Sequence, residues 1–462
     1  MNTLLWFQRD LRVSDNAALN FAVSLSKPII AVYIHSPDED APWSTGAASN
    51  WWLHHSLEQL SLKLAAMNIK LQFLKADSVT AIPKIVEETN IDTVIWTNRH
   101  EPARVQSENS LMHVLNQKSI TIKRFRDELL TQPDSFLTAS KATPYRVFTP
   151  FYKKLRSQLN LSMTSISTTK KQAVNSIQFN ELKDNVKLEK LDLLEENSWQ
   201  QKLHQHWSPG EDSALDKLDS FINDTLVDYV IQRDYPATQG TSGLSPHLHF
   251  GEISPNQILT ALSPLTHYAD NKIATAAEAF LRQLIWREFA RYILWHYPET
   301  SAEPMNKKYS DDFWKHDEKL LKKWQQGNTG IAIIDAGMRE LWETGTMHNR
   351  VRMLTASLLT KNMGLHWLHG ARWFWNTLVD ADLANNSMGW QWVAGCGVDA
   401  APYFRVFNPN TQAQKFDSQQ HYVNLWTNKN NTHQPAVDLS ISRNDALYRY
   451  KKFIKSSSGQ AS

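Results

Sequence analysis

Cysteine is the scarcest residue of this 462-residue chain, which contains only Cys396. A single thiol cannot form an internal disulfide, a cysteine-based zinc site or a cysteine-ligated iron–sulfur cluster. No apolar run approaches the roughly 20 residues that a membrane-spanning helix needs. The charged segment Gln8–Arg12 follows directly on the first apolar residues, which is unlike a secretory signal peptide. We therefore expect a cytoplasmic protein without a membrane contact.

Net charge is also small, since 49 Lys and Arg face 47 Asp and Glu, a balance of +2. Any binding site for DNA must then be a local basic patch on a nearly neutral molecule. Tryptophan, in contrast, is abundant, with 18 residues of which 11 lie beyond residue 280. These tryptophans can form an aromatic core, or they can serve stacking and electron transfer. Composition alone leaves both interpretations open.

The first 130 residues alternate apolar runs with amphipathic segments. The runs Thr3–Phe7, Pro28–Ile34, Leu71–Leu74 and Thr93–Thr97 are typical of buried strands, and Ser49–Met67, Val79–Thr89 and Ala103–Gln117 have helical spacing. This alternation predicts a Rossmann-like α/β domain with a doubly wound parallel sheet. No Gly-x-Gly-x-x-Gly pattern follows the first run, so an ordinary dinucleotide site is not supported.

The rest of the chain is predicted to be helical after a long connection. Residues 131–205 are rich in polar residues, most of all Ser162–Ala173, and are predicted to be an interdomain linker. Helical periods dominate beyond it, for example in Lys272–His296 and Thr329–Leu341. We predict an α/β domain at 1–130, the linker at 131–205, an all-helical domain at 206–455 and a disordered tail at 456–462. Nothing in the sequence requires more than a monomer.

Two polar blocks stand out in the middle of the chain. Thr241, Ser242, Gly243 and Ser245 precede a predicted helix and could offer hydroxyl and backbone N–H groups to a phosphate, although such residues are usually only helix caps. In the segment Phe280–Glu288, the side chains of Gln283 and Trp286 share one helical face. That face could accept a flat base, or the tryptophan could simply anchor helix packing.

Two further blocks combine arginines, amides and carboxylates. Asn349 and Arg352 lie three residues apart in the segment Met347–Met353, so they face one way and could hold an anion, unless the helix is only a basic surface. Asp380 and Asp382 could suggest a metal site, but no His or Cys accompanies them at a fitting distance, and we expect no metal. A carboxylate paired with Arg352 is the alternative. The block Gly397–Pro409 has no mechanism that its residues reveal.

Taken together, these blocks resemble the photolyase/cryptochrome family. The resemblance rests on Leu5–Arg12, Tyr145–Phe151, Thr241–Pro246, Ile285–Phe289, Met347–Met353, Asp380–Asn386, Gly389–Trp392 and Asp399–Arg405, and it extends from Met1 to about Asp417. It implies an α/β antenna domain followed by a helical catalytic domain that binds FAD. The sequence is most similar to bacterial photolyases that split cyclobutane pyrimidine dimers.

The resemblance implies a set of FAD-binding residues. They are Tyr229, Thr241, Ser242, Gly243, Leu244, Ser245, Phe280, Gln283, Asn349, Arg352, Asp380, Ala381, Asp382 and Asn386. Arg352 and Asp380 are expected to pair across the isoalloxazine, and Asn386 is expected to face flavin N5. A neutral amide can accept from N5–H without adding negative charge, which suits the reduced FADH⁻ that is the active form in this family.

The resemblance also assigns electron-transfer and DNA-binding roles. Trp390, Trp367 and Trp314 match the tryptophans that relay electrons to the photoexcited flavin, and with Gln283, Asn349 and Asn386 they complete the expected catalytic set. Trp286 and Trp392 match the pair that sandwiches a flipped-out dimer, with Met353 in the same pocket. Arg233, Arg350 and Arg405 match groups that bind the flanking phosphates. The expected partner is UV-damaged DNA.

Alternatives remain because the chain departs from the family pattern at position 283. Relatives that repair cyclobutane dimers usually carry Glu there, whereas Gln283 is also a feature of (6-4) photolyases. Those enzymes typically have two His near the Met347–Met353 block, and this chain has only His348, followed by Asn349. A cryptochrome photoreceptor would share the FAD site, but only about 45 residues follow Asp417. A flavin- or nucleotide-binding protein without light chemistry is the third alternative.

The antenna chromophore is the least constrained element of this prediction. The segment Ser49–His55 resembles proteobacterial and class III-like photolyases, which use a folate antenna. The segment Asn98–Pro102 lacks the Asn–Glu pair of some folate-binding relatives. We therefore predict methenyltetrahydrofolate, with a deazaflavin as the alternative.

Overall fold

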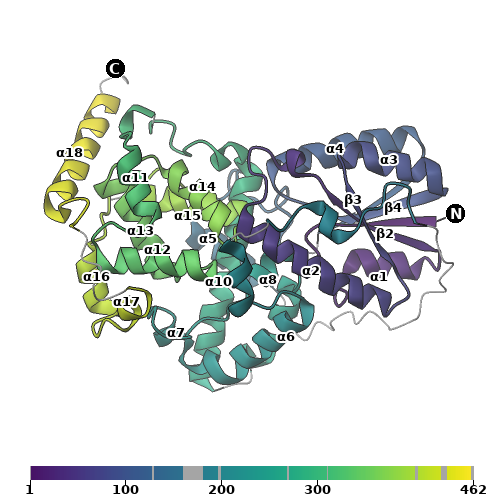
Figure 1. Cartoon of the computed structure of the whole chain (residues 1–462), viewed down its shortest axis with the longest axis horizontal. Coiled ribbons are helices and arrows are strands. Elements are labelled where there is room, and N and C mark those ends of the chain that lie inside the picture. Colours follow the sequence, from purple (N-terminus) through teal and green to yellow (C-terminus); the bar gives the residue numbers. More distant parts are fainter. Residues whose placement is uncertain are drawn as a thin grey trace. The chain divides into compact units, whose positions relative to one another are not determined.

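The computed structural model describes residues 2–126, 129–159, 181–195, 199–267, 270–309, 311–400, 404–427 and 434–458. The chain forms two compact units, and each is assembled from segments that are separate in sequence (Figure 1). The first unit comprises Met1–Leu137, Lys153–Val227 and Ser242–Glu288. The second unit comprises Thr138–Tyr152, Asp228–Thr241 and Phe289–Ser462.

The first unit is built on a five-stranded parallel sheet. Its strands are β1 (Asn2–Phe7), β2 (Ile29–His35), β3 (Leu71–Lys75), β4 (Ile91–Thr97) and β5 (Thr121–Phe125), in the order β3-β2-β1-β4-β5. The connecting helices α1 (Ala17–Ser24), α2 (Ala47–Ala65), α3 (Ser78–Thr89) and α4 (Pro102–Gln117) cover both faces, as Figure 1 shows. This is the doubly wound α/β fold that the sequence predicted.

The predicted strands and helices of this sheet are confirmed to within two residues at each end. Central strands carry side chains such as Leu4, Trp6, Val94 and Trp96, all buried in one cluster, so their apolar runs were readable. Strand β5 and helix α1 were not predicted. In β5, Thr121 and two basic residues are exposed, because an edge strand needs no continuous apolar run.

Beyond residue 205 the described chain is helical. The first unit adds α6 (Glu211–Ser220), α8 (Ser245–Phe250), α9 (Pro255–His267) and most of α10 (Asn271–His296). The second unit contains α7 (Tyr229–Gln232), α11 (Glu318–Gln325), α12 (Ala332–Thr344), α13 (Asn349–Ser357), α14 (Trp367–Thr377), α15 (Leu383–Ala394), α16 (Pro409–Phe416), α17 (His421–Trp426) and α18 (Leu439–Ser458). The predicted helical region is confirmed. None of the described helices is both long and apolar enough for a membrane span.

Several helices of the second unit begin at a residue whose side chain caps them, and three of these helices lie close to predicted site residues. His348 accepts from the N–H of Arg350 at the start of α13, and His366 accepts from the N–H of Leu368 at the start of α14. Asp382 accepts from the N–H of Asn385 at the start of α15. These bonds satisfy N–H groups that have no partner within the helix, and they fix where each helix starts.

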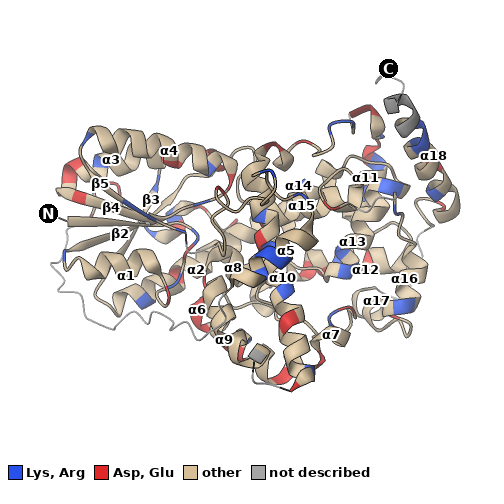
Figure 2. Cartoon of the chain, turned by 180° about the vertical axis from the view of Figure 1, so that it is seen from behind, with Lys and Arg blue, Asp and Glu red and all other residues tan. Residues whose placement is uncertain are grey.

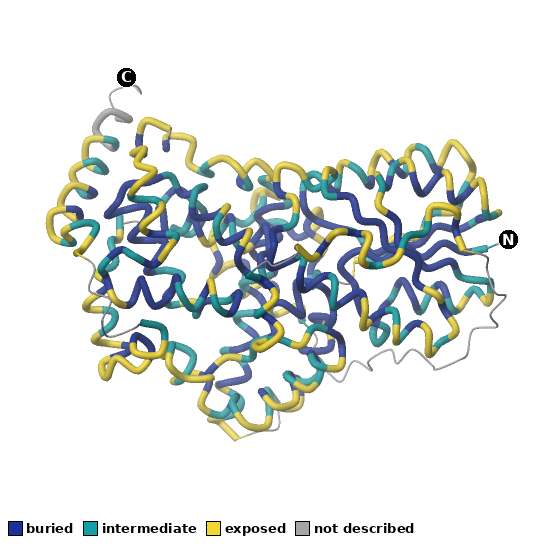
Figure 3. The backbone as a smooth tube through the Cα atoms, viewed as in Figure 1, coloured by how far each residue is buried: buried dark blue, intermediate teal, exposed yellow. Residues whose placement is uncertain are grey.

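Burial follows the inward faces of the sheet and helices, as the dark segments of Figure 3 show. In the second unit, the rings of Trp324, Phe374 and Trp390 form one cluster with centroids 5.0 to 6.0 Å apart. Part of the tryptophan surplus therefore builds the core. Acidic and basic residues are interspersed along the helices of each unit in Figure 2, as the net charge of +2 requires.

The predicted linker and tail contain more regular structure than the sequence indicated. Helix α5 (Phe148–Gln158) and the short helix Trp199–Gln205 lie within 131–205, while Ser162–Ala173 is outside the described residues. Helix α18 continues to Ser458, three residues into the segment predicted to be disordered, and 459–462 are outside the described residues. The domain boundaries at 130, 205 and 455 stay a prediction, because the compact units are interleaved in sequence.

Candidate functional site

Helix α13 and the loop before α15 are joined by an ion pair. Arg352 Nη2 lies 3.1 and 3.0 Å from the two carboxylate oxygens of Asp380. Arg352 Nε also donates to the Met347 carbonyl at 2.7 Å, which holds the guanidinium in place. The Asp380 side chain is 7% exposed and that of Arg352 is 25% exposed, so the pair lies at the edge of the interior. The predicted pairing of these two residues is present.

Asp382 and Asn386 follow on α15, with different hydrogen-bonding roles. Asp382 Oδ1 accepts from the backbone and side-chain N–H groups of Asn385, and its Oδ2 accepts from Arg291 at 3.0 Å. Asn386 Nδ2 donates to the Ala371 carbonyl at 3.0 Å. This bond fixes the orientation of the Asn386 amide and leaves Oδ1 as its acceptor, without a hydrogen-bond donor among the described residues. Ala381 is buried between these positions.

The start of α13 brings an exposed amide beside a thioether. Asn349 is exposed, and its Nδ2 lies 3.9 Å from Met353 Sδ one turn later. The cap residue His348 contacts the Arg233 carbonyl through Nε2 at 3.1 Å. Burial lowers the pKa of His348 to about 4, so its ring is neutral near pH 7. Since Nδ1 accepts from Arg350 N–H, the ring proton is on Nε2, which donates to Arg233.

A half-buried carboxyl links three helices below this cap. Glu340 Oε2 on α12 accepts from the Tyr422 hydroxyl on α17 and from the backbone N–H of His348 at 3.3 Å. Burial raises the pKa of Glu340 to about 7, although its hydrogen bonds oppose that rise. The sequence analysis did not single out Glu340 or Tyr422, because their positions are typical of ordinary helix residues. Together they support the segment that carries Asn349 and Arg352.

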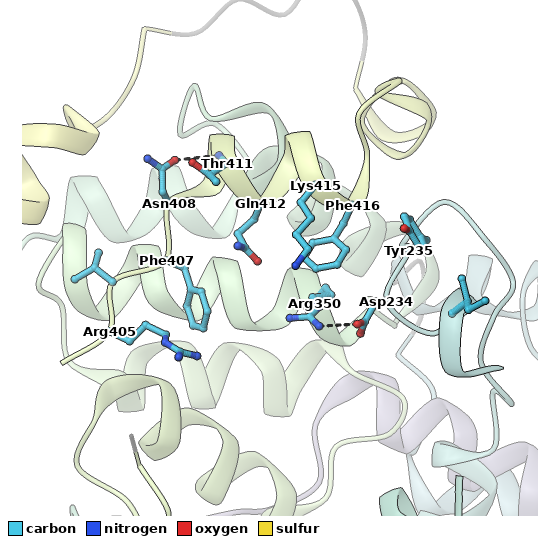
Figure 4. Close-up of a pocket in the computed structure, with 12 residues that line it drawn as sticks. Asp234, Tyr235, Arg350, Arg405, Phe407, Asn408, Thr411, Gln412, Lys415 and Phe416 are labelled. Atoms are coloured by element: carbon cyan, nitrogen blue, oxygen red, sulfur yellow. Dashed lines mark hydrogen bonds and ion pairs between the residues drawn. The ribbon is translucent and has the colours of Figure 1, made fainter. Parts of the chain in front are cut away.

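A basic groove opens beside α16, as Figure 4 shows. The groove has a volume of about 560 Å³ and is lined by residues from α7 and the segment after it, from α13, and from 405–416. Its charged lining residues are Arg350, Arg405 and Lys415 against the single carboxylate Asp234, which bonds Arg350 at 2.8 Å. With three cations and one anion, the groove favours an anionic ligand. It is a local basic patch of the kind that binds a phosphate backbone.

Aromatic rings line the same groove. The Arg350 guanidinium lies 4.4 Å from the centre of the Phe416 ring, and Phe407 faces the groove in Figure 4. Cations over rings combined with free hydroxyl and amide groups are typical of surfaces that bind nucleic acid. Arg350 and Arg405 were predicted, whereas Lys415 was missed. A single lysine near the end of a helix carries no sequence signal that distinguishes it from a solvated one.

Two other predicted residues of the second unit lie together on α7 and its end. Arg233 is half-buried, and its guanidinium lies 5.3 Å from the centre of the Tyr229 ring. Tyr229 is buried, and burial raises the pKa of its hydroxyl. Thr241 is exposed at the end of this segment. Arg233 does not line the basic groove, so its predicted phosphate contact stays a prediction.

The three predicted relay tryptophans are all buried. Trp390 on α15 packs against Gly370 on α14 so closely that a Cβ atom at residue 370 would lie 2.0 Å from the Trp390 ring. Trp367 begins α14, one turn before Gly370, and is fully buried. Trp314 is 5% exposed. The indole Nε1 atoms of Trp314 and Trp367 are buried and have no hydrogen-bond partner in the described chain.

The predicted phosphate-binding loop lies in the first unit. Ser242 Oγ accepts from the N–H of Leu244 at 3.3 Å, and Gly243 has the positive φ of +64° that glycine adopts readily. A Cβ atom on Gly243 would meet only Lys217 Nζ, at 3.8 Å. Lys217 of α6 thus places a cation beside this loop, and no sequence motif marks this lysine. Leu244 is buried, and the exposed Ser245 begins α8.

Helix α10 carries the other predicted contacts of the first unit. Phe280 is buried against Phe221, with ring centroids 4.5 Å apart. Gln283 Nε2 donates to the Ala279 carbonyl at 3.3 Å, and Trp286 is half-buried on the same face. The other predicted lesion tryptophan, Trp392, belongs to the second unit, where its Nε1 donates to the Asp399 carbonyl at 3.0 Å. Both indoles keep part of their surface exposed.

The carboxyl ends of β1 and β4 are filled by a buried ionic network. Arg99 donates to both Glu101 oxygens at 2.9 and 2.8 Å, and Arg9 approaches Glu101 at 3.5 Å. Burial opposes ionisation of Glu101, yet Arg99, His100 and Arg9 hold its pKa well below its usual range. Only about 20 Å³ remains free at this point, which is room for a single water. Arg99 and Glu101 of the predicted antenna segment Asn98–Pro102 are therefore paired with each other.

The other predicted antenna segment, Ser49–His55, lies on α2. Trp52 is fully buried and donates to Glu252 Oε1 at 3.0 Å, and Trp51 is 3% exposed. These two rings belong to the core of the first unit. Across the described residues, no three side chains of His, Cys, Asp or Glu are grouped in a way that could hold a metal ion.

Comparisons with known proteins agree with this arrangement. Residues 280–451 match the family model described as the FAD binding domain of DNA photolyase, and residues 3–172 match the model described as DNA photolyase. The deoxyribodipyrimidine photo-lyase of Agrobacterium fabrum is 41% identical over 421 residues, which cover 91% of this chain and 85% of that protein. Cryptochrome-1 of Arabidopsis thaliana is 32% identical over 92% of this chain and 62% of that protein.

The fold is also similar to solved structures. The crystal structure of a bacterial class III photolyase from Agrobacterium tumefaciens matches with a TM-score of 0.88 and 36% identity, over 98% of both chains. The two family models together cover the strands of the sheet, the helices that carry Arg352 and Asn386, and the loop that carries Asp380. This chain therefore belongs to the DNA photolyase and cryptochrome family.

Proposed function

We propose that this protein binds FAD and uses blue light to repair cyclobutane pyrimidine dimers in DNA. The observation that carries the proposal is that one short helix, α13, contributes to two different sites. Arg350 lines the basic groove, and Arg352, two residues later, pairs with Asp380. Residues two apart on a helix point in nearly opposite directions. Helix α13 thus links a surface suited to DNA phosphates with the polar cluster suited to a flavin.

The polar cluster fits the flavin in its donors and acceptors. Asn386 offers a fixed, neutral amide oxygen, as an N–H group of the isoalloxazine requires. Arg352 is held by Asp380 and by the Met347 carbonyl, so a positive group is already oriented for an electron-rich ring. Asn349 is exposed and able to bond a ligand. In the first unit, Lys217 and the loop Ser242–Ser245 would hold the phosphates.

Bound FAD would supply the chemistry, because its reduced form, excited by blue light, lends an electron to the dimer and recovers it after two carbon–carbon bonds have broken. The protein's residues bind and orient. Asn386 would hold the flavin N–H, and Trp286 and Trp392 are each a half-exposed indole on which a pyrimidine base could stack. Arg350, Arg405 and Lys415 bind the phosphates that flank the lesion.

The relay of Trp390, Trp367 and Trp314 would return oxidised flavin to its active state. All three are buried, and Trp390 and Trp367 lie on the packed helices α15 and α14. For the antenna, we propose methenyltetrahydrofolate, with a deazaflavin as the alternative. The ionic network of Arg99 and Glu101 occupies the carboxyl ends of the strands, so a chromophore would bind elsewhere on the protein or would have to displace it.

Two other functions are each favoured by one observation. The identity of 32% to a plant cryptochrome favours a photoreceptor, which would share the flavin site. Gln283, in place of the usual Glu, favours repair of (6-4) products. The basic groove and the half-exposed tryptophans suit DNA repair better than signalling, and the single histidine His348, followed by Asn349, favours the cyclobutane dimer over the (6-4) product.

The decisive experiment uses purified, photoreduced protein and two duplexes. One duplex carries a single cyclobutane thymine dimer, and the other carries a (6-4) product, with dark controls for both. Light-dependent loss of the cyclobutane lesion alone is the expected result. Loss of the (6-4) product alone would show that Gln283 determines the lesion. A yellow protein that photoreduces but repairs neither duplex would instead be a photoreceptor.

A further inference from the structure

An imidazole ring lies between two of the relay tryptophans. The centroid of the His366 ring is 5.2 Å from that of Trp314 and 5.9 Å from that of Trp367. The rings of His366 and Trp367 are inclined by only 27°, so they are stacked, while His366 and Trp314 are inclined by 56°. The imidazole thus contacts both indoles, which come from separate segments of the second unit.

The position and protonation of this ring are fixed by its surroundings. His366 Nδ1 accepts from the N–H of Leu368 at 3.1 Å, as the cap of α14. Burial lowers the pKa of His366 to about 4, an effect that His369, His316 and Arg372 reinforce and that Asp311 opposes. The ring is therefore neutral near pH 7, with its proton on Nε2. Nε2 lies 3.7 Å from Asp311 Oδ1, a carboxylate that is itself exposed.

A neutral aromatic ring at this place suits the movement of an electron. When Trp367 has lost an electron it carries a positive charge, and a protonated histidine beside it would oppose that charge. A neutral imidazole does not. It also provides a π system in contact with both indoles, and electron transfer slows steeply as the gap between aromatic groups widens.

We propose that His366 is a positioning residue that bridges Trp314 and Trp367 in the path of electrons to the flavin. The proposal rests on the proposed function, in which excited, oxidised FAD accepts the electron. Trp390 gives one electron to the flavin, Trp367 replaces it, and Trp314 gives its electron through His366 to Trp367. A thiol reductant in solution then restores Trp314, so each electron gained by the flavin is one lost by the thiol.

Two substitutions can separate the role of His366 as a helix cap from its role as a bridge between the tryptophans. His366→Asn keeps a strong helix cap, since Asn is among the preferred N-cap residues, but it removes the aromatic ring. His366→Phe keeps an aromatic ring of similar size and removes the cap. If His366 serves only as the helix cap, His366→Phe should be the variant that is impaired. If His366 bridges the tryptophans, His366→Asn should be the variant with slower electron transfer.

The experiment measures photoreduction of the full-length flavoprotein under blue light with a thiol reductant. A laser flash followed by transient absorption gives the yield and lifetime of the oxidised tryptophan. We expect His366→Asn to slow photoreduction several-fold with an unchanged melting temperature. We expect His366→Phe to keep nearly the original rate while it melts at a lower temperature. Equal rates in wild type and His366→Asn, or an equal slowing in both variants, would overturn the proposal.

Two measurements distinguish this failure from failure of the proposed function. Trp314→Phe should slow photoreduction at least as much as His366→Asn does, and an unchanged rate would show that the relay itself is wrong. Repair of a cyclobutane dimer by wild-type protein that has been reduced chemically does not need the relay. Absence of that repair would contradict the repair function, and the photoreduction rates would still test the bridge.

Discussion

Arg352 and Asp380 are joined through a single guanidinium nitrogen, with Nη2 at 3.1 and 3.0 Å from the two carboxylate oxygens. They lie 28 positions apart in the chain, and their bond fixes α13 against the segment that leads into α15. The Asp380 side chain is only 7% exposed, so the ion pair lies largely out of contact with solvent on that side. The pair is therefore both a structural joint and the centre of the candidate flavin cluster.

The first prediction concerns this pair. Arg352→Gln leaves the Asp380 carboxylate without its cation, and we expect a loss of about 2 kcal/mol in the free energy of unfolding, since Arg352 is partly exposed. We also expect a lower flavin content after purification. Flavin absorbance per protein and thermal melting measure the two effects. Arg443→Gln, at an exposed position on α18, is the control and should change neither.

The second prediction uses two glycines on adjacent helices. A Cβ atom at Gly370 would lie 2.0 Å from the Trp390 ring, so Gly370→Ala must displace the indole or the helix. We expect slower photoreduction and a lower melting temperature. Gly389→Ala is the matched change, because no atom of the described residues lies within 4 Å of an added Cβ atom there and alanine favours the helix by up to about 1 kcal/mol. If Gly370→Ala behaves like Gly389→Ala, the packing of Trp390 is not needed for the relay.

The third prediction concerns the departure at position 283. Gln283 Nε2 donates to the Ala279 carbonyl one turn earlier, so its amide oxygen is the end that remains for a lesion. Gln283→Glu replaces that end with a carboxylate, as in most dimer-repairing relatives, and we expect more repair per absorbed photon. Repair yield and lesion affinity on the cyclobutane duplex measure this. Gln106→Glu, exposed on α4, controls for the added charge. Unchanged values would show that position 283 is not limiting.

The fourth prediction follows from the pKa of Glu340, which burial raises from 4.5 to about 7. The folded protein holds this proton more tightly than the unfolded chain does. The resulting stabilisation is complete below pH 4.5 and is lost as the pH rises to about 7, a change of about 3 kcal/mol. Glu340→Gln keeps a neutral side chain that can accept from Tyr422, so its free energy of unfolding should not show this pH-dependent decrease.

Melting curves between pH 5 and 8 test the fourth prediction. The stability of Glu340→Gln relative to wild type should grow between pH 5 and 7 and then stay level, because other titrating groups are common to both proteins. Glu195→Gln, at an exposed position, should run parallel to wild type over the same range. A constant difference between Glu340→Gln and wild type would mean that Glu340 titrates outside this range.

Local sequence patterns predicted the elements that depend on neighbouring residues. Apolar runs marked β1 to β4, and helical spacing marked α2, α3 and α4, because burial of one face is written into consecutive positions. The edge strand β5 escaped prediction because its side chains are mostly exposed. The motif around Met347–Met353 and Asp380–Asn386 also allowed the pairing of Arg352 with Asp380 to be predicted, since the family resemblance supplied the partner.

Other contacts are between residues that no sequence motif connects. Lys217 lies beside Gly243, Lys415 lines a groove with Arg350, and Glu340 bonds Tyr422, yet each is an ordinary helix residue in sequence. The sequence alone determined the alternation of strands and helices in the α/β sheet, and it contained the family motifs. The bridge of His366 between Trp314 and Trp367 was decided by the tertiary structure. A contact of this kind depends on how helices pack, and packing is set by the whole interior rather than by any single segment.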